Sequence, residues 1–389
     1  MSTYLVRPDV QHRQFKSRFT LGLLVAAGAL ALAAGPVLAH GDDDEDGDRH
    51  GKRGVCSTTA KLALKACRAE ARDDLLIATA TCINLSDRDD RRGCKREVRK
   101  ENSDFLELCK EQFDARLDVC DLVGEGPYDP DFETDQFEPG GNRYFPLTVG
   151  NEWKYKSEFT DEEGEDITEI ITVRVLDNED QPGTYATKNI GRTEDSDGVT
   201  CLVVNDLVEA NGEVIEDTDD WYTRKVETGD VWYCGELARD FETFDEDSPT
   251  LPELVSIDGS FKAGRDGDKA GILVPERPHK RQAYRQEFSL GNAEDVAQVL
   301  STDYVFGRET NNPNSLDYLV PEELANRFCP DKDARCVVTR DFTPLEPDVE
   351  ERKYRAPGIG VFLEVNLTEK VITELVECNF DSNCPVVAP

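Results

Sequence analysis

The sequence has few basic residues, few histidines and almost no methionine. Lys and Arg total 45 against 81 Asp and Glu, which gives a formal net charge of −36. Phosphates would be repelled, so this charge argues against nucleic acid or an anionic membrane surface as the main partner. Hydrophobic residues still make up 38 % of the chain, which excludes wholesale disorder. The 389 residues leave room for two domains and a leader.

The sequence also lacks the short motifs that mark well-known catalytic chemistry. It contains no C-x-x-C, G-x-S-x-G, H-E-x-x-H, G-x-G-x-x-G or G-x-x-x-x-G-K-[ST] pattern. A Ser-His-Asp triad in either expected domain would have to use His279, which lies in a Pro-rich basic loop without a nucleophile motif. A carboxylate pair acting as acid and base stays open as a hydrolase hypothesis, but the many acids hide any functional pair.

The first 39 residues predict a secretory signal peptide. Arg13, Lys16 and Arg18 supply its positive end, and residues 19–35 form an uninterrupted run of apolar and small residues. The mature chain is expected to begin at His40 and to keep no stable membrane anchor. An uncleaved anchor is the alternative, because the run nearly reaches the roughly 20 residues that a membrane span needs. The expected destination is the periplasm or the extracellular space.

Twelve cysteines in an exported chain predict six disulfides. The first six are spaced by 11, 15, 12, 15 and 11 residues, and this palindrome favours one of the fifteen connectivities. Two antiparallel helices that turn near Arg88 would bring the mirror pairs together. The expected nested bridges are Cys56–Cys120, Cys67–Cys109 and Cys82–Cys94.

Apolar residues and Cys recur every three or four positions from Cys56 to Leu85 and from Cys94 to Cys120, which also predicts two helices within a hairpin of residues 55–122. The first helical face is mostly Ala, so the shared core is thin and disulfides would supply the missing stability. Ser86 is the expected cap of the second helix. A metal site is the alternative, but the cysteines are widely spaced and no His lies between positions 51 and 278.

The turn of this hairpin is basic. From Arg88 to Lys100 there are seven Lys or Arg against three acids. Such a segment is either a solvated helix end or a docking site for an acidic surface. One version of the second reading is self-association, in which the tip meets the acidic domain of another copy.

Acidic segments flank the hairpin. Residues 40–54 predict a flexible acidic tail, and an EF-hand fails there because Arg53 occupies the position of the bidentate Glu. His40, with its free amine, and His50 are candidate copper ligands. Residues 123–142 contain six acids, no base and three prolines, which predicts a linker.

Residues 143–389 predict a mainly antiparallel β domain, either a sandwich or a partly open barrel, so the fold class is α+β. Segments 167–176, 200–208 and 361–376 are rich in Val, Ile, Thr and aromatic residues, with Gly, Asn and Asp between them. Residues 221–222 are expected to face residues 231–233 across a turn. Short helices are expected at 293–300 and 321–327. The remaining disulfides are expected to be Cys201–Cys234, Cys329–Cys336 and Cys378–Cys384.

Four segments of this domain resemble a family of uncharacterised secreted bacterial proteins. They are YFPLTVGNEWKY (144–155), DTDDWYTRKVETGDVWYCGE (217–236), FTPLEP (342–347) and YRAPGIGVFLE (354–364). The resemblance covers about residues 143–376, and a Cys-bearing helical hairpin ahead of the domain also resembles the family. It implies an all-β domain, similar to the partly open barrel of periplasmic lipoprotein carriers, and carries no activity or catalytic residue. The inserted segment 311–336 and the extra cysteines depart from the pattern.

Two groups of side chains are candidates for binding. An apolar ligand cavity would be lined by six aromatic residues: Trp153, Tyr155, Trp221, Tyr222, Trp232 and Tyr233. Calcium would be bound by acids in turns and strands: Asp217, Asp219, Asp220, Asp266 and Asp268.

The whole sequence therefore predicts an exported, non-catalytic binding or interaction protein. Its β domain would bind an unknown protein or apolar ligand, and its hairpin would be a rigid arm. A carboxylate-dependent secreted hydrolase and a calcium- or copper-binding protein are the alternatives, and no other cofactor is expected.

Overall fold

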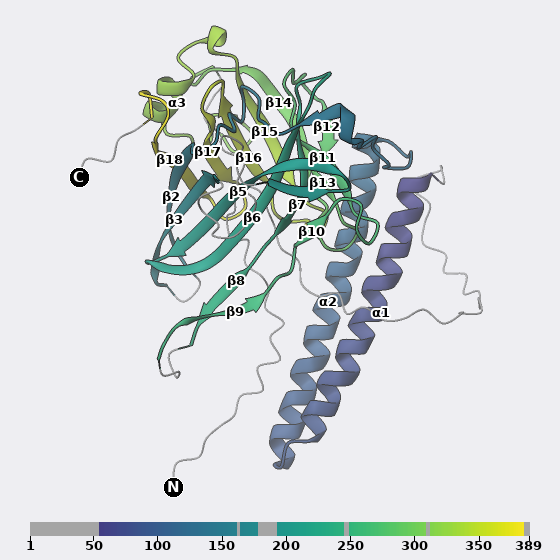
Figure 1. The fold of residues 1–389 in the computed structure, drawn as a ribbon. Helices are drawn as coiled ribbons and strands as arrows, with labels where there is room; N and C mark the ends of the chain where they lie inside the picture. The colour runs from purple at the N-terminus through teal and green to yellow at the C-terminus, as the bar shows by residue number, and fades with distance from the viewer. Residues whose placement is uncertain (1–53, 162–163, 178–192, 245–248, 309–311, 385–389) are drawn as a thin grey trace. The chain divides into compact units, whose positions relative to one another are not determined.

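The computed structural model describes residues 54–161, 164–177, 193–244, 249–308 and 312–384 (Figure 1). The expected signal peptide and most of the acidic tail, with His40 and His50, lie outside the described residues. The described chain divides into two compact units, one over residues 54–127 and one over residues 128–384. No helix among these residues combines the length and the apolar content that a membrane crossing requires.

The first unit is an antiparallel helical hairpin of α1 (Val55–Ile83) and α2 (Arg88–Val123). Nested disulfides join Cys56 to Cys120, Cys67 to Cys109 and Cys82 to Cys94, with Cα–Cα distances of 5.8, 5.8 and 5.6 Å. The palindromic spacing predicts these pairs, and the prediction is confirmed. Apart from Cys82, the buried apolar side chains of α1 are the small Ala60, Ala71 and Ala78. The covalent bridges therefore reinforce a thin core.

Asp87 caps the second helix, so the expectation of Ser86 is wrong by one residue. The Asp87 carboxylate accepts hydrogen bonds from the backbone N–H groups of Asp89 and Asp90 at 2.7 and 3.1 Å. The bonds from Asp90 and Asp89 lower the pKa of the Asp87 carboxyl. Arg91 donates to the carbonyl oxygens of Leu85 and Ser86, which fixes the turn between the helices.

Over its described residues, the second unit is mainly antiparallel sheet, with one short α-helix and two short 3-10 helices. Its helices are η1 (Thr134–Gln136), α3 (Glu322–Phe328) and η3 (Lys332–Ala334). Its strands are β1 (Phe137–Glu138), β2 (Glu152–Thr160), β3 (Asp166–Val175), β4 (Thr193–Ser196), β5 (Val199–Ala210), β6 (Glu213–Lys225), β7 (Val231–Leu237), β8 (Asp240–Thr243), β9 (Pro252–Ser256), β10 (Phe261–Lys262), β11 (Lys269–Val274), β12 (Ala283–Arg285), β13 (Glu287–Phe288), β14 (Val296–Tyr304), β15 (Cys336–Phe342), β16 (Glu351–Ala356), β17 (Gly360–Asn366) and β18 (Val371–Cys378).

These strands curl into a nearly closed barrel. Antiparallel neighbours run from β14 through β15, β16, β17, β18, β2, β3, β5, β6 and β7 to β11. The ring is completed by a short closing segment, residues 283–288, in which β12 pairs with β14 and β13 pairs with β11. The pairing of β13 with β11 involves only two residues on each strand. The closing segment is therefore the part of the ring with the fewest paired residues.

Alternation of side chains explains which face of each strand is buried. Strands β2 and β3 alternate buried and half-buried positions, as expected where one face lines a core. Strands β16 and β17 are buried on both faces. Their outer face is covered, because the Tyr354 hydroxyl donates to the Leu316 carbonyl at 2.6 Å and Phe328 of α3 packs on Phe362.

The strand expectations are mostly confirmed, and one helix is wrong. The three segments expected as strands form β3, β5, β17 and β18, and Tyr222 lies opposite Tyr233 in the β6–β7 hairpin. The helix expected at 321–327 is α3, which begins after Pro321. The helix expected at 293–300 is largely strand β14, because residues 296–304 pair with β12 and β15.

Part of the expected linker packs on the sheet. Within residues 128–142, β1 pairs with β6, and Phe137 is buried against Trp232. The Tyr128 hydroxyl donates to the Ala270 carbonyl at 2.9 Å. These contacts are the reason that the second compact unit begins at Tyr128.

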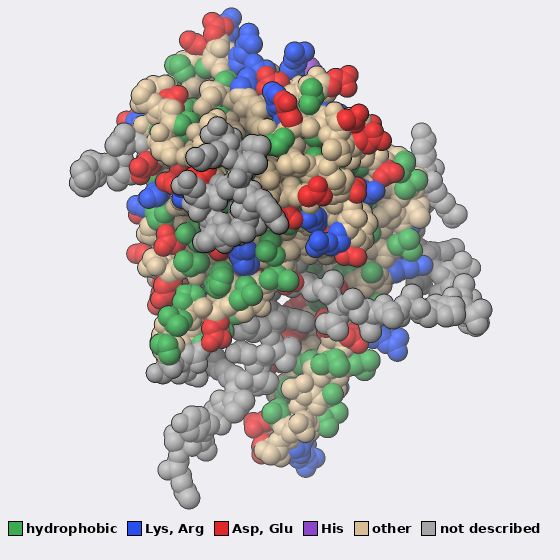
Figure 2. All heavy atoms as spheres, viewed as in Figure 1, with side chains coloured by type: hydrophobic (Ala, Val, Ile, Leu, Met, Phe, Trp, Pro, Cys, Tyr) green, Lys and Arg blue, Asp and Glu red, His purple; other side chains and the backbone are tan. Residues whose placement is uncertain are grey.

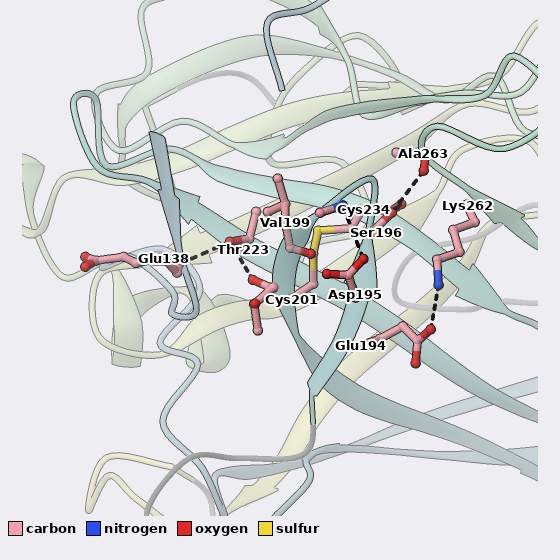
Figure 3. Close-up of a disulfide and its surroundings, with 12 residues drawn as sticks. Glu138, Glu194, Asp195, Ser196, Val199, Cys201, Thr223, Cys234, Lys262 and Ala263 are labelled. Carbon is pink, nitrogen blue, oxygen red and sulfur yellow. Dashed lines mark hydrogen bonds and ion pairs between the residues drawn. A yellow bond between two sulfur atoms is a disulfide. The ribbon is translucent and has the colours of Figure 1, made fainter. Parts of the chain in front are cut away.

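The three disulfides of the β unit also match their predictions: Cys201–Cys234, Cys329–Cys336 and Cys378–Cys384. The first joins β5 to β7, two strands that flank β6 (Figure 3). Beside it, the buried Ser196 hydroxyl lies 3.0 and 3.2 Å from the carbonyl oxygens of Cys234 and Ala263 (Figure 3). This bridge belongs to a small apolar cluster that also contains Phe137 and Trp232.

Candidate functional site

Carboxylic acids gather inside the barrel. Positions 216, 218, 220 and 222 of β6 share one strand face, and Tyr222 on that face belongs to the main core. Asp220 lies directly opposite Glu236 of β7. Glu236 and Glu287 of β13 are 2 % and 0 % exposed. We call Glu216, Asp220, Glu236 and Glu287 the carboxyl cluster.

Tyr233 links two members of this cluster. Its hydroxyl oxygen lies 2.5 Å from Asp220 Oδ1 and 2.9 Å from Glu236 Oε2. A phenol has one proton to donate, so it can donate to only one of two carboxylates. The second hydrogen bond requires that one carboxyl is itself protonated and donates to the phenolic oxygen. This geometry therefore requires a proton on either Asp220 or Glu236.

Burial accounts for that proton. Removal from water raises the pKa of Asp220 to about 7, and the hydrogen bond from Tyr233 partly opposes this. Burial, followed by the charges of Glu287 and Asp220, raises the pKa of Glu236 well above its ordinary value. Glu216 shifts in the same direction, again mainly through burial. Glu236 is thus the expected proton carrier, and Asp220 is the expected acceptor.

Glu287 is the least satisfied member. Neither of its carboxylate oxygens accepts a hydrogen bond of standard geometry from the described residues, although the backbone N–H of Asp295 lies near enough to lower its pKa in part. Burial, followed by the charges of Asp295 and Asp220, raises the pKa of Glu287 well above its ordinary value. An ionised carboxylate buried without a partner costs several kcal/mol, so Glu287 needs either a proton or a positive charge beside it.

Lys353 of β16 is a buried base whose positive charge acts against the raised pKa of Asp220 and of Glu287. Its Nζ lies 3.6 Å from Glu364 and 3.9 Å from Glu351, both nearly buried. Burial alone would lower the pKa of Lys353, but Glu364 and its acidic neighbours outweigh burial and raise it. Next to it, Arg355 lies 3.8 Å from Asp341. The positive charge of Lys353 is therefore divided among several acids, and it only partly offsets the shift at Glu287.

The six aromatic candidates do not form one group. Trp153, Tyr155, Tyr222 and Tyr233 are buried in the main core, whereas Trp232 and the partly buried Trp221 belong to the outer cluster. Trp153 donates to the Ile359 carbonyl at 2.7 Å, and Tyr155 donates to the Val361 carbonyl at 3.0 Å. Four of the six are thus packed core residues, three of them with hydrogen-bonded polar atoms, and the apolar cavity stays a prediction.

The calcium candidates are also separated. Asp217 and Asp219 share the face of β6 opposite to Asp220, and both contact Arg239, at 3.2 and 3.5 Å. Asp266 and Asp268 lie in the turn between β10 and β11. The part of the chain that the structure describes contains no group of three or more His, Cys, Asp or Glu arranged to hold a metal ion.

Most of the carboxyl cluster could not be chosen from the sequence. Asp220 was a candidate, but for calcium, and Tyr233 was a candidate for an apolar cavity. Glu216, Glu236 and Glu287 carry no distinguishing motif among 81 acids. One signal in the sequence could have revealed the β6 members. Acids alternate along that strand on the same face as Tyr222, an aromatic residue expected in the core.

Comparisons with known proteins leave the family open. No family model matches the chain, and no curated protein matches it. One solved structure that resembles it is a candidate lipoprotein from Parabacteroides distasonis ATCC 8503. The two chains are 9 % identical with a TM-score of 0.25, over 61 % of this chain and 99 % of the other. A likeness of this size carries no argument about function.

Proposed function

We propose that this chain is an exported, non-catalytic binding protein whose β unit binds a small organic cation at the carboxyl cluster, with the helical hairpin as a rigid arm. The observation that carries the proposal is Glu287, a fully buried carboxyl whose two oxygens accept no hydrogen bond of standard geometry from the described residues, with only the backbone N–H of Asp295 near them. An ammonium group would supply both the missing donors and the missing charge.

The chemistry favours an amine over the other ligands that the sequence suggested. An apolar ligand would leave Glu287 unsatisfied. A calcium ion takes six to eight oxygen ligands, and no group of three acids with suitable geometry occurs among the described residues. Glu287 also lies on the closing segment, where β13 pairs with β11 through only two residues and Tyr128 packs on the neighbouring Phe288.

Export is supported by independent features. Six disulfides join all twelve cysteines, and such bonds persist in oxidising compartments. The leader predicted over residues 1–39 agrees with this. Periplasm and extracellular space are equally compatible with both features.

The test is thermal melting of the oxidised mature chain with methylammonium or 1,4-diaminobutane at pH 6 and pH 8. Binding to the folded state raises Tm, and we expect a rise of about 2 °C or more, larger at pH 8 because the cation competes with protons. Glu287→Gln is expected to abolish the rise. Glu253→Gln, an exposed strand position, is the matched control and should behave as wild type.

Two results would overturn the proposal. One is an equal Tm rise in the wild type and in Glu287→Gln. The other is no rise with either amine at pH 8, which would leave protons as the only occupants of the cluster. Tm is also measured with calcium and with a chelator. A Tm rise with calcium that Glu287→Gln abolishes would identify the ligand as a metal ion and not an amine.

A second candidate, a carboxylate-dependent hydrolase, is favoured by one observation. Asp220 and Glu236 share a proton through Tyr233, and an acid and a base held in different protonation states are what general acid–base chemistry needs. Glycosidic and ester substrates would be screened with the wild type and Glu236→Gln. Turnover that the variant loses would support this candidate, and its absence throughout would remove it.

A further inference from the structure

The two sides of the hairpin tip differ in chemistry. Leu76 and Ile83 of α1 are 59 % and 57 % exposed, although they are large aliphatic residues. Counting 100° per residue from Cys82, which faces α2, places them about 120° and 100° around the helix. They therefore lie on the same side of α1, away from the disulfide seam.

Basic residues of α2 lie on the matching side. The same count on α2 starts from Cys94, which is bonded to Cys82. It places four bases between about 100° and 160° around the helix: Lys95 at 100°, Arg88 at 120°, Arg99 at 140° and Arg92 at 160°. In an antiparallel pair, equal rotations from the facing positions lead to the same side of the pair. Leu76, Ile83, Arg88, Arg92, Lys95 and Arg99 thus share one side, which we call the tip face.

The other side of the tip also carries Arg96, Lys100 and the exposed Ile77, but there they are mixed with acids. By the same count Asp89, Asp90 and Glu97 are rotated in the opposite sense. Within the described residues, Arg92 is the only base of the tip face with an ion pair, to Asp89 at 3.1 Å. In Figure 2, a small group of basic side chains lies at the lower tip of the hairpin, with acidic side chains beside it and hydrophobic side chains above it.

We propose that the tip face docks on an anionic phospholipid surface. Exposed aliphatic side chains flanked by Lys and Arg are the chemistry of interfacial helices, which insert apolar groups below the headgroups and pair their bases with lipid phosphates. An acidic protein surface would explain the bases but would leave Leu76 and Ile83 exposed to water.

The negative charge of the whole chain does not prevent this contact. The tip lies at the end of α1, a helix of 29 residues and therefore about 44 Å long. The hairpin itself is nearly neutral, with 13 basic and 14 acidic residues over residues 55–122. Charges farther away than the Debye length of about 8 Å are largely screened at physiological salt.

The test is cosedimentation of the oxidised mature chain with vesicles of phosphatidylglycerol and phosphatidylcholine, against vesicles of phosphatidylcholine alone. Two pairs of neighbouring residues give matched variants. Leu76→Ser and Arg99→Glu change the tip face, whereas Ile77→Ser, 64 % exposed in the wild type, and Lys100→Glu make the same changes on the other side. All four positions are exposed, so folding is preserved, and circular dichroism checks this.

We expect binding to the anionic vesicles only, weakened about tenfold by Leu76→Ser and by Arg99→Glu. Ile77→Ser and Lys100→Glu should stay within about twofold of wild type by the same reasoning. Equal losses in both members of a pair would overturn the proposal. Concentration-dependent dimerisation without vesicles, lost in Arg99→Glu, would also overturn it and assign the tip to a second copy of the chain.

Discussion

Asp220 and Glu236 face each other across neighbouring strands and share a single phenolic hydroxyl, that of Tyr233. Both hydrogen bonds need two protons, one on the phenol and one on a carboxyl, which is one more than a phenol and two ionised carboxylates carry. The hydrogen bonds inside the barrel consequently depend on which carboxyls are protonated, so changes in pH should affect the stability of the β unit.

Stability of the β unit is expected to decrease from pH 5 to pH 8. Burial raises the pKa of Asp220 and Asp295 to about 7 and that of Glu346 to about 8, whereas the same groups titrate near pH 4 in an unfolded chain. Between these values the folded state holds protons that the unfolded state has released, so raising the pH favours unfolding. Tm measured by calorimetry at pH 5, 6, 7 and 8 checks this.

A variant separates this effect from general charge repulsion. Glu287→Gln removes one raised group and should flatten the dependence, while Glu253→Gln, exposed in β9, should leave it unchanged. A Tm that rises between pH 5 and pH 8 would contradict the assignment of protons to the barrel interior.

Gly271→Ala is expected to open the ring. A Cβ at Gly271 of β11 would lie 2.4 Å from the backbone carbon and oxygen of Gln286, in the closing segment. Backbone atoms cannot move aside as a flexible side chain does, so we expect a loss of about 2 kcal/mol or more in the free energy of unfolding. Urea denaturation followed by Trp fluorescence measures it.

Gly93→Ala is the contrasting glycine variant. Gly93 lies within α2, and an added Cβ would meet nothing within 4 Å. Alanine should therefore stabilise the hairpin by about 1 kcal/mol, since glycine is the weaker helix former. If Gly271→Ala proved as benign as Gly93→Ala, the close approach of β11 to the closing segment would be wrong.

Loss of the three hairpin disulfides should unfold α1 and α2 while the β unit remains folded. The buried side chains of α1 are mostly Ala, and each native bridge contributes about 2–4 kcal/mol, less when nested. The measurement uses a chain in which the six hairpin cysteines are replaced by Ser. Circular dichroism at 222 nm should lose most of its helical signal.

Trp fluorescence gives the control, because Trp153, Trp221 and Trp232 all lie in the β unit. Its emission should match that of the wild type. Undiminished helical signal in the Ser variant would show that packing alone holds the hairpin together.

The hairpin could be predicted in detail because its information is local and symmetric. The spacing of Cys56, Cys67 and Cys82 mirrors that of their partners, so the sequence itself fixes which residues meet. Residues 293–300 show the opposite case. Ala293, Glu294 and Gln298 favour helix, but hydrogen bonds to β12 and β15 override this preference, and those partners are distant in sequence.

The carboxyl cluster was hidden for a related reason. A strand with polar residues at every second position normally turns them toward water, and β6 instead turns Glu216 and Asp220 toward the core. Which face of β6 points into the barrel depends on other strands that are distant in sequence. One of them is β13, which contributes Glu287. Sequence reasoning could find Tyr233 and Asp220 as candidates for separate roles, but not Glu236 or the contact that joins the three.

The bridge between Cys201 and Cys234 has a mechanical consequence. It ties β5 to β7 around β6, across a sequence separation of 33 residues. A force applied to the ends of the oxidised chain cannot extend the residues within that loop, which shortens the stretched contour by about 12 nm relative to the reduced chain. The middle strand of this sheet region is thus shielded from tension.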